Sequence, residues 1–539
     1  MKFLAFLLFA WAKGLRRSFE RELTFPAYYQ NKLLKRIIKE ASHGEYGRHF
    51  KLSRHSDYAE YKKRIPIVGY EDLEPWILKQ KDLGKNSFGR EKVLFYEKTS
   101  GSSGATKYIP YTRALKSSFQ SMFLLWLGDL SKNGPKLHHF RTYMSVSPAL
   151  AATETAESGT PVGIEDDTEY LNFFAKVLVK RFLFVPKSVK SVRDPETFLR
   201  VLACYLVAQA DLEIISIWSP TFLVQVLEFI KTNPEKIIST LRAGELKTSK
   251  GNFKFSPVHE VRLQLLNEKK IDWRKLWPDL KLISAWASAQ SEFFANRLRG
   301  ELPQVFFQAK GLLATEAPMT LPWISARGCV PLPAEIFYEF EDGEGQIRLL
   351  HELALGQDYG LILTQKSGLL RYRIGDRVRV SATYLNTPCL EFIGRSESVS
   401  DLVGEKLNED YVAECFREIA GDQYFALLIP EFDADGAARY IAVFEEPAQI
   451  HRPEILALAL DRRLQRAYHY QQARQLGQLE QIQVLLHHSP QTVYNDYYLR
   501  QGMKWGDIKS KTLIHNVNTG REIIALFRAE PQSPRTPAP

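Results

Sequence analysis

The segment Tyr96–Pro110 constrains this chain more than any other stretch of its sequence. It runs from an apolar, strand-like stretch into a turn of small and hydroxyl-bearing residues that ends on a lysine: Thr99, Ser100, Gly101, Ser102, Ser103, Gly104, Ala105, Thr106 and Lys107. Small residues let backbone N–H groups converge on an anion, and hydroxyls and an ammonium complete its shell. The segment predicts an anion-binding loop, with a flexible Gly/Ser surface loop as the alternative. It is not a Walker A loop, because Thr106 stands where that motif has glycine.

The composition is that of a multidomain globular protein with 539 residues, 45% hydrophobic and 25% charged. The net charge is +10, but basic and acidic residues are interleaved without a long Lys/Arg tract. A nucleotide or carboxylate ligand explains this charge as well as a polymer does, and we expect no nucleic-acid partner. The four cysteines show no zinc-binding spacing and favour a reducing, cytoplasmic location.

The N-terminus carries an apolar run, Phe3–Trp11, that is too short to span a bilayer. Lys13, Arg16 and Arg17 follow at once, which is unfavourable for a secretory signal. We expect a structural first helix rather than a signal peptide or a membrane-surface anchor. No stable membrane span is predicted.

Periodicity along the chain predicts an α/β fold, with a helical region, a region of alternating helices and strands, and a β-rich region in succession. The first hundred residues read as helical, and a further apolar helix covers Ser117–Leu130. Helix-like and buried-strand patterns then alternate, with helices at 196–210 and 222–230 and strands at 213–218, 280–286 and 305–307. From Glu335 to Val380 short alternating stretches with Gly-containing turns indicate a β-rich subdomain.

The pattern changes again after Gly394-Arg395. Helices are expected at 408–419 and 453–474, with strands at 425–429, 440–444 and 482–486, which together make a small α+β unit. The expected domains are 1–393 and 394–529, followed by a Pro-rich disordered tail at 530–539.

Four further motifs follow the loop in order. Glu316 ends Gly311–Glu316 after a strand, where a carboxylate can hold Mg²⁺ that bridges nucleotide phosphates; the alternative is a solvated loop glutamate. Asp376 follows a turn glycine and can accept hydrogen bonds from ribose hydroxyls; the alternative is an ordinary Gly-Asp turn. Gly394-Arg395 marks the domain change, and Gly502–Lys509 lies near the C-terminus.

Taken in this order, the five motifs resemble the adenylate-forming superfamily of acyl-CoA synthetases, peptide-synthetase adenylation domains and luciferases. The stretches around them resemble one branch more closely, the auxin-responsive acyl-acid amido synthetases. These stretches are Trp277–Lys281, Ala285–Gln290, Tyr372–Val378, Leu476–Leu479 and Gly502–Lys509. The resemblance runs from about Arg21 to about Leu513. It implies a large N-terminal adenylate-forming domain with mixed sheets and a small mobile C-terminal domain.

The resemblance also implies roles for single residues. Thr99–Lys107 would bind the ATP phosphates, Glu316 would hold magnesium, and Lys509 would enter the site from the C-terminal domain, with Lys107 and Glu316 as its catalytic partners. The remaining ATP contacts would come from Ala289, Gln290, Leu312, Thr315, Tyr372, Asp376 and Arg395. Leu312 departs from the tyrosine of the plant members. Lys504 and Lys511 are alternatives to Lys509.

The implied reaction is ATP-dependent adenylation of a carboxylic acid, followed by transfer of the acyl group to an amine, here expected to be an amino acid. No side-chain nucleophile is needed, which agrees with the lack of a recognisable nucleophile–base arrangement. The rivals are an acyl-CoA ligase of the same superfamily and a catalytically silent acyl- or nucleotide-binding protein. The sequence does not identify the acyl acid, the amine acceptor or the oligomeric state.

Overall fold

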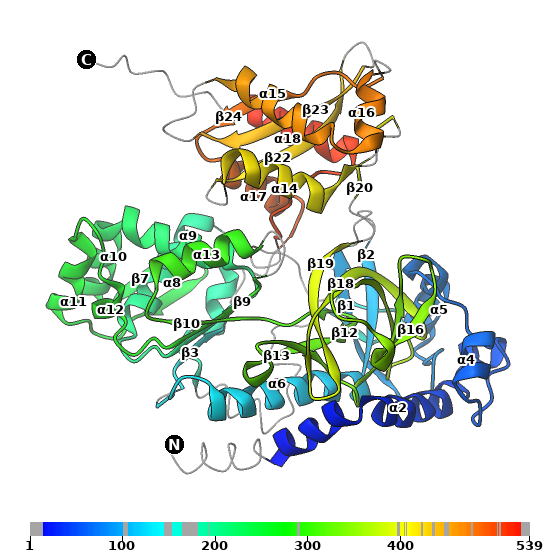
Figure 1. Cartoon of the computed structure of the whole chain (residues 1–539). Coiled ribbons are helices and arrows are strands. Elements are labelled where there is room, and N and C mark those ends of the chain that lie inside the picture. Colours follow the sequence, from blue (N-terminus) through cyan, green and yellow to red (C-terminus); the bar gives the residue numbers. More distant parts are fainter. Residues whose placement is uncertain are drawn as a thin grey trace. The chain divides into compact units, whose positions relative to one another are not determined.

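The computed structural model describes residues 14–100, 106–138, 140–144, 154–163, 182–192, 194–287, 291–395, 399–400, 402–403, 405, 407–421, 424–433, 437–446, 452–475, 478–503, 505 and 508–529 (Figure 1). Contacts divide the chain into two compact units. The first unit comprises Met1–Ile217, Phe229–Trp286 and Leu302–Ile393, and the second comprises Trp218–Glu228, Ala287–Glu301 and Gly394–Pro539. Within the described ranges, no helix has the length and apolar character to cross a membrane.

The helical start of the chain follows its apolar spacing. Residues 14–24 are helical. Helix α2 (Pro26–Ala41) begins with a proline, a residue that is favourable at the first position of a helix. The inner face of α2 buries Leu33, Leu34, Ile37 and Ile38, as their spacing predicts. The other helices that begin in the first unit are α3 (Glu45–His49), α4 (Tyr58–Arg64), α5 (Tyr70–Leu83), α6 (Arg113–Asn133), α8 (Pro195–Ala208), α10 (Pro234–Ala243), α11 (Glu260–Gln264) and α12 (Trp273–Leu276). The expected run Phe3–Trp11 lies outside the described residues.

Three larger sheets build the first unit, and they include the predicted buried strands. One is parallel, in the order β10-β9-β6-β3. Its strands are β3 (Thr142–Met144), β6 (Ile214–Ser216), β9 (Leu282–Ala285) and β10 (Phe306–Ala309). Because the strands are parallel, their carboxyl ends share one edge, where ligands of open α/β sheets bind.

The β-rich subdomain is the five-stranded sheet β16-β15-β17-β18-β19. Its strands are β15 (Ile336–Glu341), β16 (Ile347–Leu349), β17 (Asp358–Gln365), β18 (Tyr372–Tyr384) and β19 (Thr387–Arg395). Its inner face packs into a core with residues such as Tyr338, Leu363 and Val378. Short pairs complete the unit: β7 (Glu245–Thr248) with β8 (Gly251–Lys254), β11 (Leu313–Ala314) with β12 (Ala317–Pro318), and β13 (Thr320–Trp323) with β14 (Gly328–Pro331).

The loop segment follows the expected strand and precedes the expected apolar helix, but a second strand, which was not predicted, lies between the loop and that helix. The two strands form an antiparallel hairpin in the sheet β2-β1-β5-β4, and a helix begins only after the second strand. The strands are β1 (Val93–Ser100), β2 (Thr106–Thr112), β4 (Glu154–Thr155) and β5 (Pro161–Val162). Thr99 pairs with Lys107 and Ser100 with Thr106. The physical reason is that Ile109 and Tyr111 bury completely in the core, which extends the chain beyond the lysine.

The C-terminal part of the second unit is an α+β body around the sheet β22-β23-β24. The strands of this sheet are β22 (Ala426–Phe432), β23 (Ala438–Glu445) and β24 (Gln483–His487). A separate two-stranded pair consists of β20 (Val399–Ser400) and β21 (Leu407–Asn408). The helices of this body are α14 (Glu409–Ala420), α15 (Pro453–Leu464), α16 (Tyr468–Gln475), α17 (Pro490–Arg500) and α18 (Val517–Ala529). The second unit also includes the first part of α9 (Pro220–Thr232) and all of α13 (Ser291–Glu301). Apolar clusters cover both faces of the sheet. The tail 530–539 lies outside the described residues.

The predicted single helix at 453–474 is wrong, because the chain breaks between α15 and α16. The buried carboxylate of Asp461 accepts hydrogen bonds from Tyr470 at 2.8 Å and Arg474 at 3.0 Å. A straight helix would separate residues 461 and 470 by roughly 13 Å along its axis. The turn at Gln465–Ala467 lets the second helix fold back onto this carboxylate.

Candidate active site

Glu316 lies in the two-residue turn between β11 and β12, and its side chain is buried, with 8% of the residue exposed. Two strands hold this turn. Tyr111 of β2 donates a hydrogen bond to the carbonyl oxygen of Thr315 at 2.6 Å. Tyr372 of β18 donates one to Oε1 of Glu316 at 3.3 Å. Tertiary structure therefore brings the loop hairpin, the Glu316 turn and the Tyr372 motif together.

Lys107 of β2 contacts Tyr70, the first residue of helix α5. Its Nζ is 5.3 Å from the centre of the Tyr70 ring, within the range of a cation–π interaction. The Tyr70 hydroxyl accepts a hydrogen bond from the Tyr108 backbone N–H at 2.7 Å. Burial raises the pKa of Tyr70 to about 12, and the negative charge of Glu316 acts in the same direction. Tyr70 thus contacts Lys107 and is influenced by the charge of Glu316.

Asp376 is buried on β18, where the strand departs from regular pairing. Gly360 of β17 pairs with Arg377 of β18, and Ile362 pairs with Arg373. The stretch of β18 between these pairs is therefore longer than the stretch of β17 opposite it, which makes a bulge. Gly375 in this bulge has φ +85°, a conformation that favours glycine. Bulges re-aim side chains and recur beside active sites. The bulge therefore decides the direction of Asp376, whose residue is only 3% exposed.

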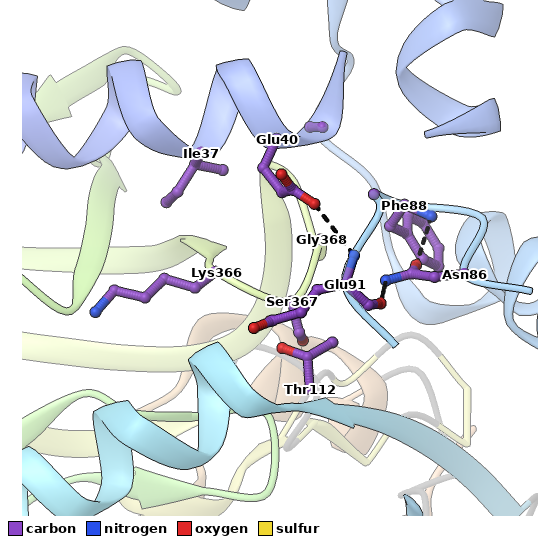
Figure 2. Close-up of a pocket in the computed structure, with 11 residues that line it drawn as sticks. Ile37, Glu40, Asn86, Phe88, Glu91, Thr112, Lys366, Ser367 and Gly368 are labelled. Carbon is purple, nitrogen blue, oxygen red and sulfur yellow. Dashed lines mark hydrogen bonds between the residues drawn. The ribbon is translucent and has the colours of Figure 1, made fainter. Parts of the chain in front are cut away.

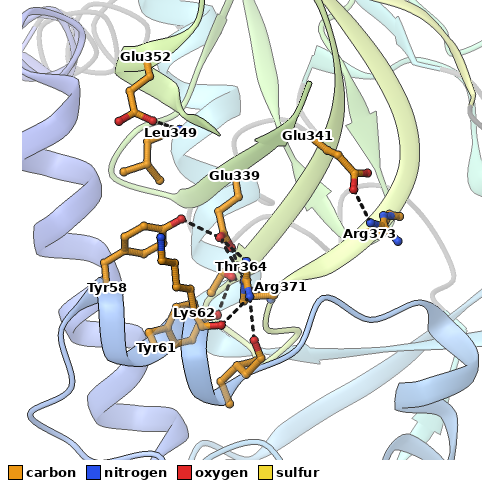
Figure 3. A network of polar contacts seen from close by, with 11 residues as sticks. Tyr58, Tyr61, Lys62, Glu339, Glu341, Leu349, Glu352, Thr364, Arg371 and Arg373 are labelled. Carbon is orange, nitrogen blue, oxygen red and sulfur yellow. Dashed lines mark hydrogen bonds and ion pairs between the residues drawn. The ribbon is translucent and has the colours of Figure 1, made fainter. Parts of the chain in front are cut away.

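A buried ion pair fixes the start of β18 immediately before Tyr372 (Figure 3). Arg371 takes the left-handed conformation, with φ +48°, and its guanidinium lies 2.9 Å from Oε1 of Glu339. The same guanidinium donates to the carbonyl oxygens of Lys62 and Ile65 at 3.0 and 2.9 Å. Tyr58 donates to Glu339 at 3.0 Å.

Sequence reasoning assigned no role to Arg371, which directly precedes the Tyr372 motif, and it missed Glu339. The alternating pattern of β15 marks Glu339 as a strand position, yet the residue is only 1% exposed. No local signal points to its partner, which lies 32 residues away.

The stretch that precedes Glu316 leaves the carboxyl edge of the parallel sheet. Lys310 follows β10, and its Nζ donates to the Ser216 hydroxyl at the end of β6 at 3.0 Å. At Gly311 an added Cβ would lie 2.2 Å from the carbonyl oxygen of Thr320. The Leu312 N–H donates to the Thr320 hydroxyl at 2.7 Å, and Leu312 packs beside the core of the β-rich sheet. Lys310 and Ser216 are edge residues that the sequence reasoning missed.

The other predicted residues are placed only in part. Thr99 and Ser100 belong to β1, and Arg395 ends β19, but only their backbone is described. Gly101, Ser102, Ser103, Gly104, Ala289 and Gln290 lie outside the described residues, as does the alternative lysine, Lys504.

In the second unit, Lys509 has an exposed side chain on a backbone that is held on both sides. The Tyr494 hydroxyl donates to the Lys509 carbonyl oxygen at 2.9 Å. Oε1 of Glu409 accepts from the Thr512 N–H at 2.9 Å, and His515 lies 3.5 Å from the other carboxylate oxygen. Lys511 is partly buried in the same segment. Its catalytic role, and that of Lys509, stays a prediction.

A small cavity in the first unit lies apart from these residues (Figure 2). It is lined by residues such as Glu40, Phe88, Thr112 and Lys366. None of the predicted site residues that the structure describes lines it. Glu40 there accepts a hydrogen bond from the Arg90 N–H at 2.7 Å, so the cavity belongs to the packing of α2.

Family models match most of the first unit. The GH3 family N-terminal domain matches residues 15–305, and the GH3 family central domain matches residues 329–395. This chain belongs to the GH3 family.

Similar proteins agree with this membership. The indole-3-acetic acid-amido synthetase GH3.10 of Arabidopsis thaliana is 25% identical over 449 residues, covering 70% of this chain and 73% of that protein. The 4-substituted benzoates-glutamate ligase GH3.12 of Arabidopsis thaliana is 23% identical over 418 residues, covering 71% of each chain. The solved structure of the AtGH3.15 acyl acid amido synthetase in complex with 2,4-DB gives a TM-score of 0.82 at 19% identity, covering 96% of both chains.

A solved coenzyme A ligase also has a similar fold. The structure of 2-hydroxyisobutyryl-CoA ligase in the postadenylation state gives a TM-score of 0.52 at 13% identity, covering 95% of this chain and 94% of that chain. The predicted family and the α/β adenylate-forming fold are therefore confirmed. The predicted class of reaction is the one that the names of these GH3 relatives give.

Proposed function

We propose that this chain uses ATP to activate a small carboxylic acid as its acyl-adenylate and then joins the acyl group to the amine of an amino acid. The observation that carries the proposal is the position of Glu316. A carboxylate in a short turn is held from β2 and β18, and Lys107 of β2 lies over the ring of Tyr70. The names of the GH3 relatives support amide formation as the second half of the reaction.

Each predicted residue has a place in this proposal. Lys107 and the segment Thr99–Gly104 hold the ATP phosphates. Asp376 accepts hydrogen bonds from the ribose hydroxyls, with Tyr372 before it and Arg395 beside it. The adenine pocket comprises Ala289, Gln290, Leu312 and Thr315.

The donor set suits a magnesium ion that is shared with phosphates. In the described part of the chain, no group of three or more His, Cys, Asp or Glu side chains could hold a metal by itself. Mg²⁺ commonly uses one or two carboxylates together with substrate phosphates, and Glu316 supplies one carboxylate. When bound, the ion would reduce the negative charge on the phosphates.

Two displacements complete the reaction. A carboxylate oxygen of the acid attacks the α-phosphorus of ATP, the bond to the bridging oxygen breaks, and pyrophosphate leaves. The neutral amine then attacks the activated carbonyl carbon, the bond to the AMP oxygen breaks, and the amine nitrogen loses a proton. Lys107 and Lys509 supply positive charge where negative charge develops. Positioning both reactants can contribute on the order of 7–11 kcal/mol.

The C-terminal segment 394–529 is proposed as the mobile lid that carries Lys509, with 1–393 as the ATP- and acid-binding domain and 530–539 as a disordered tail. Domain closure often completes a site only when substrate is bound. The free cysteines Cys204, Cys329, Cys389 and Cys415 support a reducing, cytoplasmic setting. Interdomain distances measured by fluorescence should shift when ATP and acid are added, and an unchanged distribution would contradict the lid.

The test of the proposed function is acid-dependent exchange of labelled pyrophosphate into ATP, screened over a library of carboxylic acids. We expect Glu316→Gln to lose exchange by about a hundredfold or more, since a metal clamp contributes several kcal/mol. Glu344→Gln is the matched control, because Glu344 is an exposed carboxylate in a turn of the first unit. No exchange with any acid, or full exchange in Glu316→Gln, would contradict the proposal.

The second candidate function is that of a CoA ligase. It is supported by the similarity of the fold to that of 2-hydroxyisobutyryl-CoA ligase. Supplying the best acid and ATP with either amino acids or coenzyme A, and identifying products by mass, separates the two. A thioester without an amide would overturn the acceptor and leave the adenylation step in place.

A further inference from the structure

The first two helices of the chain present a continuous cationic outer face. Its members recur at helical spacing, and all are exposed: Arg17, Arg21, Phe25, Tyr28, Lys32, Lys35, Arg36 and Lys39. Helical hydrogen bonds continue through the bend between the helices, from Phe25 N–H to Arg21 and from Tyr29 N–H to Phe25. The eight residues therefore follow one stripe, here called the basic face.

The acidic side chains of this stretch turn away from the basic face. Glu20 pairs with the buried Arg16 at 2.6 Å. Glu22 lies beside Glu335 and the Ala334 backbone, and Glu40 accepts from the Arg90 backbone N–H at 2.7 Å. None of these three carboxylates is exposed to the extent of the basic-face residues. The face thus carries six cations and no acid.

The inner sides of both helices are fixed to the first unit, so the basic face is rigid. Gln30 is buried, and its amide donates to the carbonyl oxygens of Pro333 and Ile336 at 2.8 and 2.6 Å. The Thr387 hydroxyl donates to the Leu23 carbonyl oxygen at 2.6 Å, and the ring of Phe19 packs edge-on against Trp323. A preformed face of this kind binds with little ordering cost.

Two aromatic rings lie among the cations. Phe25 is 60% exposed and Tyr28 is 62% exposed, and Lys32 Nζ lies 5.9 Å from the centre of the Tyr28 ring. Aromatic rings beside lysine and arginine are characteristic of surfaces that sit at the headgroup level of a membrane.

We propose that the basic face binds an anionic lipid surface and holds the enzyme at a membrane without crossing it. Charge complementarity selects an anionic partner, and six clustered cations attract anionic headgroups at close range. The exposed rings of Phe25 and Tyr28 favour lipid over nucleic acid. A second copy of the chain would place cations against cations in a symmetric contact. The proposal is independent of the catalytic roles assigned above.

The test measures cosedimentation of the full chain with vesicles of phosphatidylcholine with and without phosphatidylserine. The key variant is Lys32→Glu/Lys35→Glu/Arg36→Glu. The matched control is Lys250→Glu/Lys269→Glu/Lys270→Glu, which makes the same change in net charge at exposed lysines of the first unit. Thermal unfolding and pyrophosphate exchange of both variants report whether the fold and the site are intact.

We expect the wild type to bind only the phosphatidylserine vesicles and to be released by salt. The basic-face variant should bind about a hundredfold more weakly, and the control variant close to wild type. Phe25→Ser/Tyr28→Ser should weaken binding severalfold and leave its salt dependence unchanged. Absence of wild-type binding at low salt, or equal loss in both charge variants, would overturn the proposal. If the same lysines bind single-stranded RNA and the chain does not bind vesicles, the proposal is overturned and the basic face is a nucleic-acid site.

Discussion

The Tyr372 hydroxyl donates a hydrogen bond to Oε1 of Glu316 at 3.3 Å across 56 residues of sequence. This contact joins the nucleotide motif on β18 to the turn that carries the predicted magnesium ligand. The hydrogen bond orients the Glu316 carboxylate through its Oε1 atom. Groups that donate a hydrogen bond to a metal ligand commonly change the affinity for the metal by about 10–100-fold.

Tyr372→Phe should therefore weaken the use of Mg-ATP without unfolding the protein. We expect kcat/KM for Mg-ATP to fall about tenfold, the scale of a single lost hydrogen bond to a charged group. Tyr384→Phe, on the same strand, is the control and should retain activity. Titration of Mg²⁺ at fixed ATP provides the measurement. Identical behaviour of the two variants would mean that the Glu316 contact has no role in ion binding.

Arg371→Met should destabilise the first unit strongly, because it leaves Glu339 buried without its main partner. Breaking a buried pair typically costs about 3–5 kcal/mol of unfolding free energy. The neighbouring pair, Arg373 with Glu341 at 2.8 Å, joins the same two stretches but is partly exposed (Figure 3). Arg373→Met should cost less than about 1 kcal/mol. Urea unfolding compares the two, and equal losses would contradict the structural role of Arg371.

Gly311→Ala should also destabilise the chain, for a steric reason. The new Cβ would meet the Thr320 carbonyl oxygen at 2.2 Å, and a backbone atom cannot move aside like a flexible side chain. A cost of about 1–3 kcal/mol is expected. Gly300→Ala is the control, since nothing lies within 4 Å of a Cβ there and the position is in helix α13, where alanine is favoured. Thermal unfolding should rank the two variants on opposite sides of wild type.

Lys509→Ala should slow adenylate formation about a hundredfold while ATP binding changes little, if this lysine reaches the α-phosphate as proposed. Single-turnover measurement of pyrophosphate release separates the two effects. Lys511→Ala tests the register, because its side chain lies two residues along the same segment. A normal Lys509→Ala beside a crippled Lys511→Ala would reassign the catalytic lysine.

The stability of the chain should depend on pH through Glu22. Burial, reinforced by the charge of Glu335, raises the pKa of Glu22 from 4.5 to about 7. The folded state then binds more protons than the unfolded state between these values, so this residue's contribution to stability is full below pH 4.5 and is lost as pH rises toward 7. Glu22→Gln should be more stable than wild type above neutral pH, by about 1–3 kcal/mol, and equal to it near pH 4.5. A constant difference across the pH range would contradict the shifted pKa.

Local pattern was enough to determine the order of elements and the family. The spacing of Leu33, Leu34, Ile37 and Ile38 predicted the buried side of α2, and short alternating runs predicted the β-rich sheet, because side-chain period is a local property of helix and strand. The ordered motifs from the Gly/Ser loop to Gly502–Lys509 were enough to recognise the acyl-acid amido synthetases, which the GH3 family models confirm.

Only the tertiary structure decided which side chains meet. Tyr372 reaches Glu316, Lys107 stacks on Tyr70, and Arg371 finds Glu339, and none of these pairs has a local sequence signal. The break between α15 and α16 likewise depends on the buried carboxylate of Asp461, and the unpredicted strand that contains Lys107 depends on core burial of Ile109 and Tyr111. These outcomes depend on packing between residues far apart in the chain, which overrides local propensity and which no single window of sequence contains.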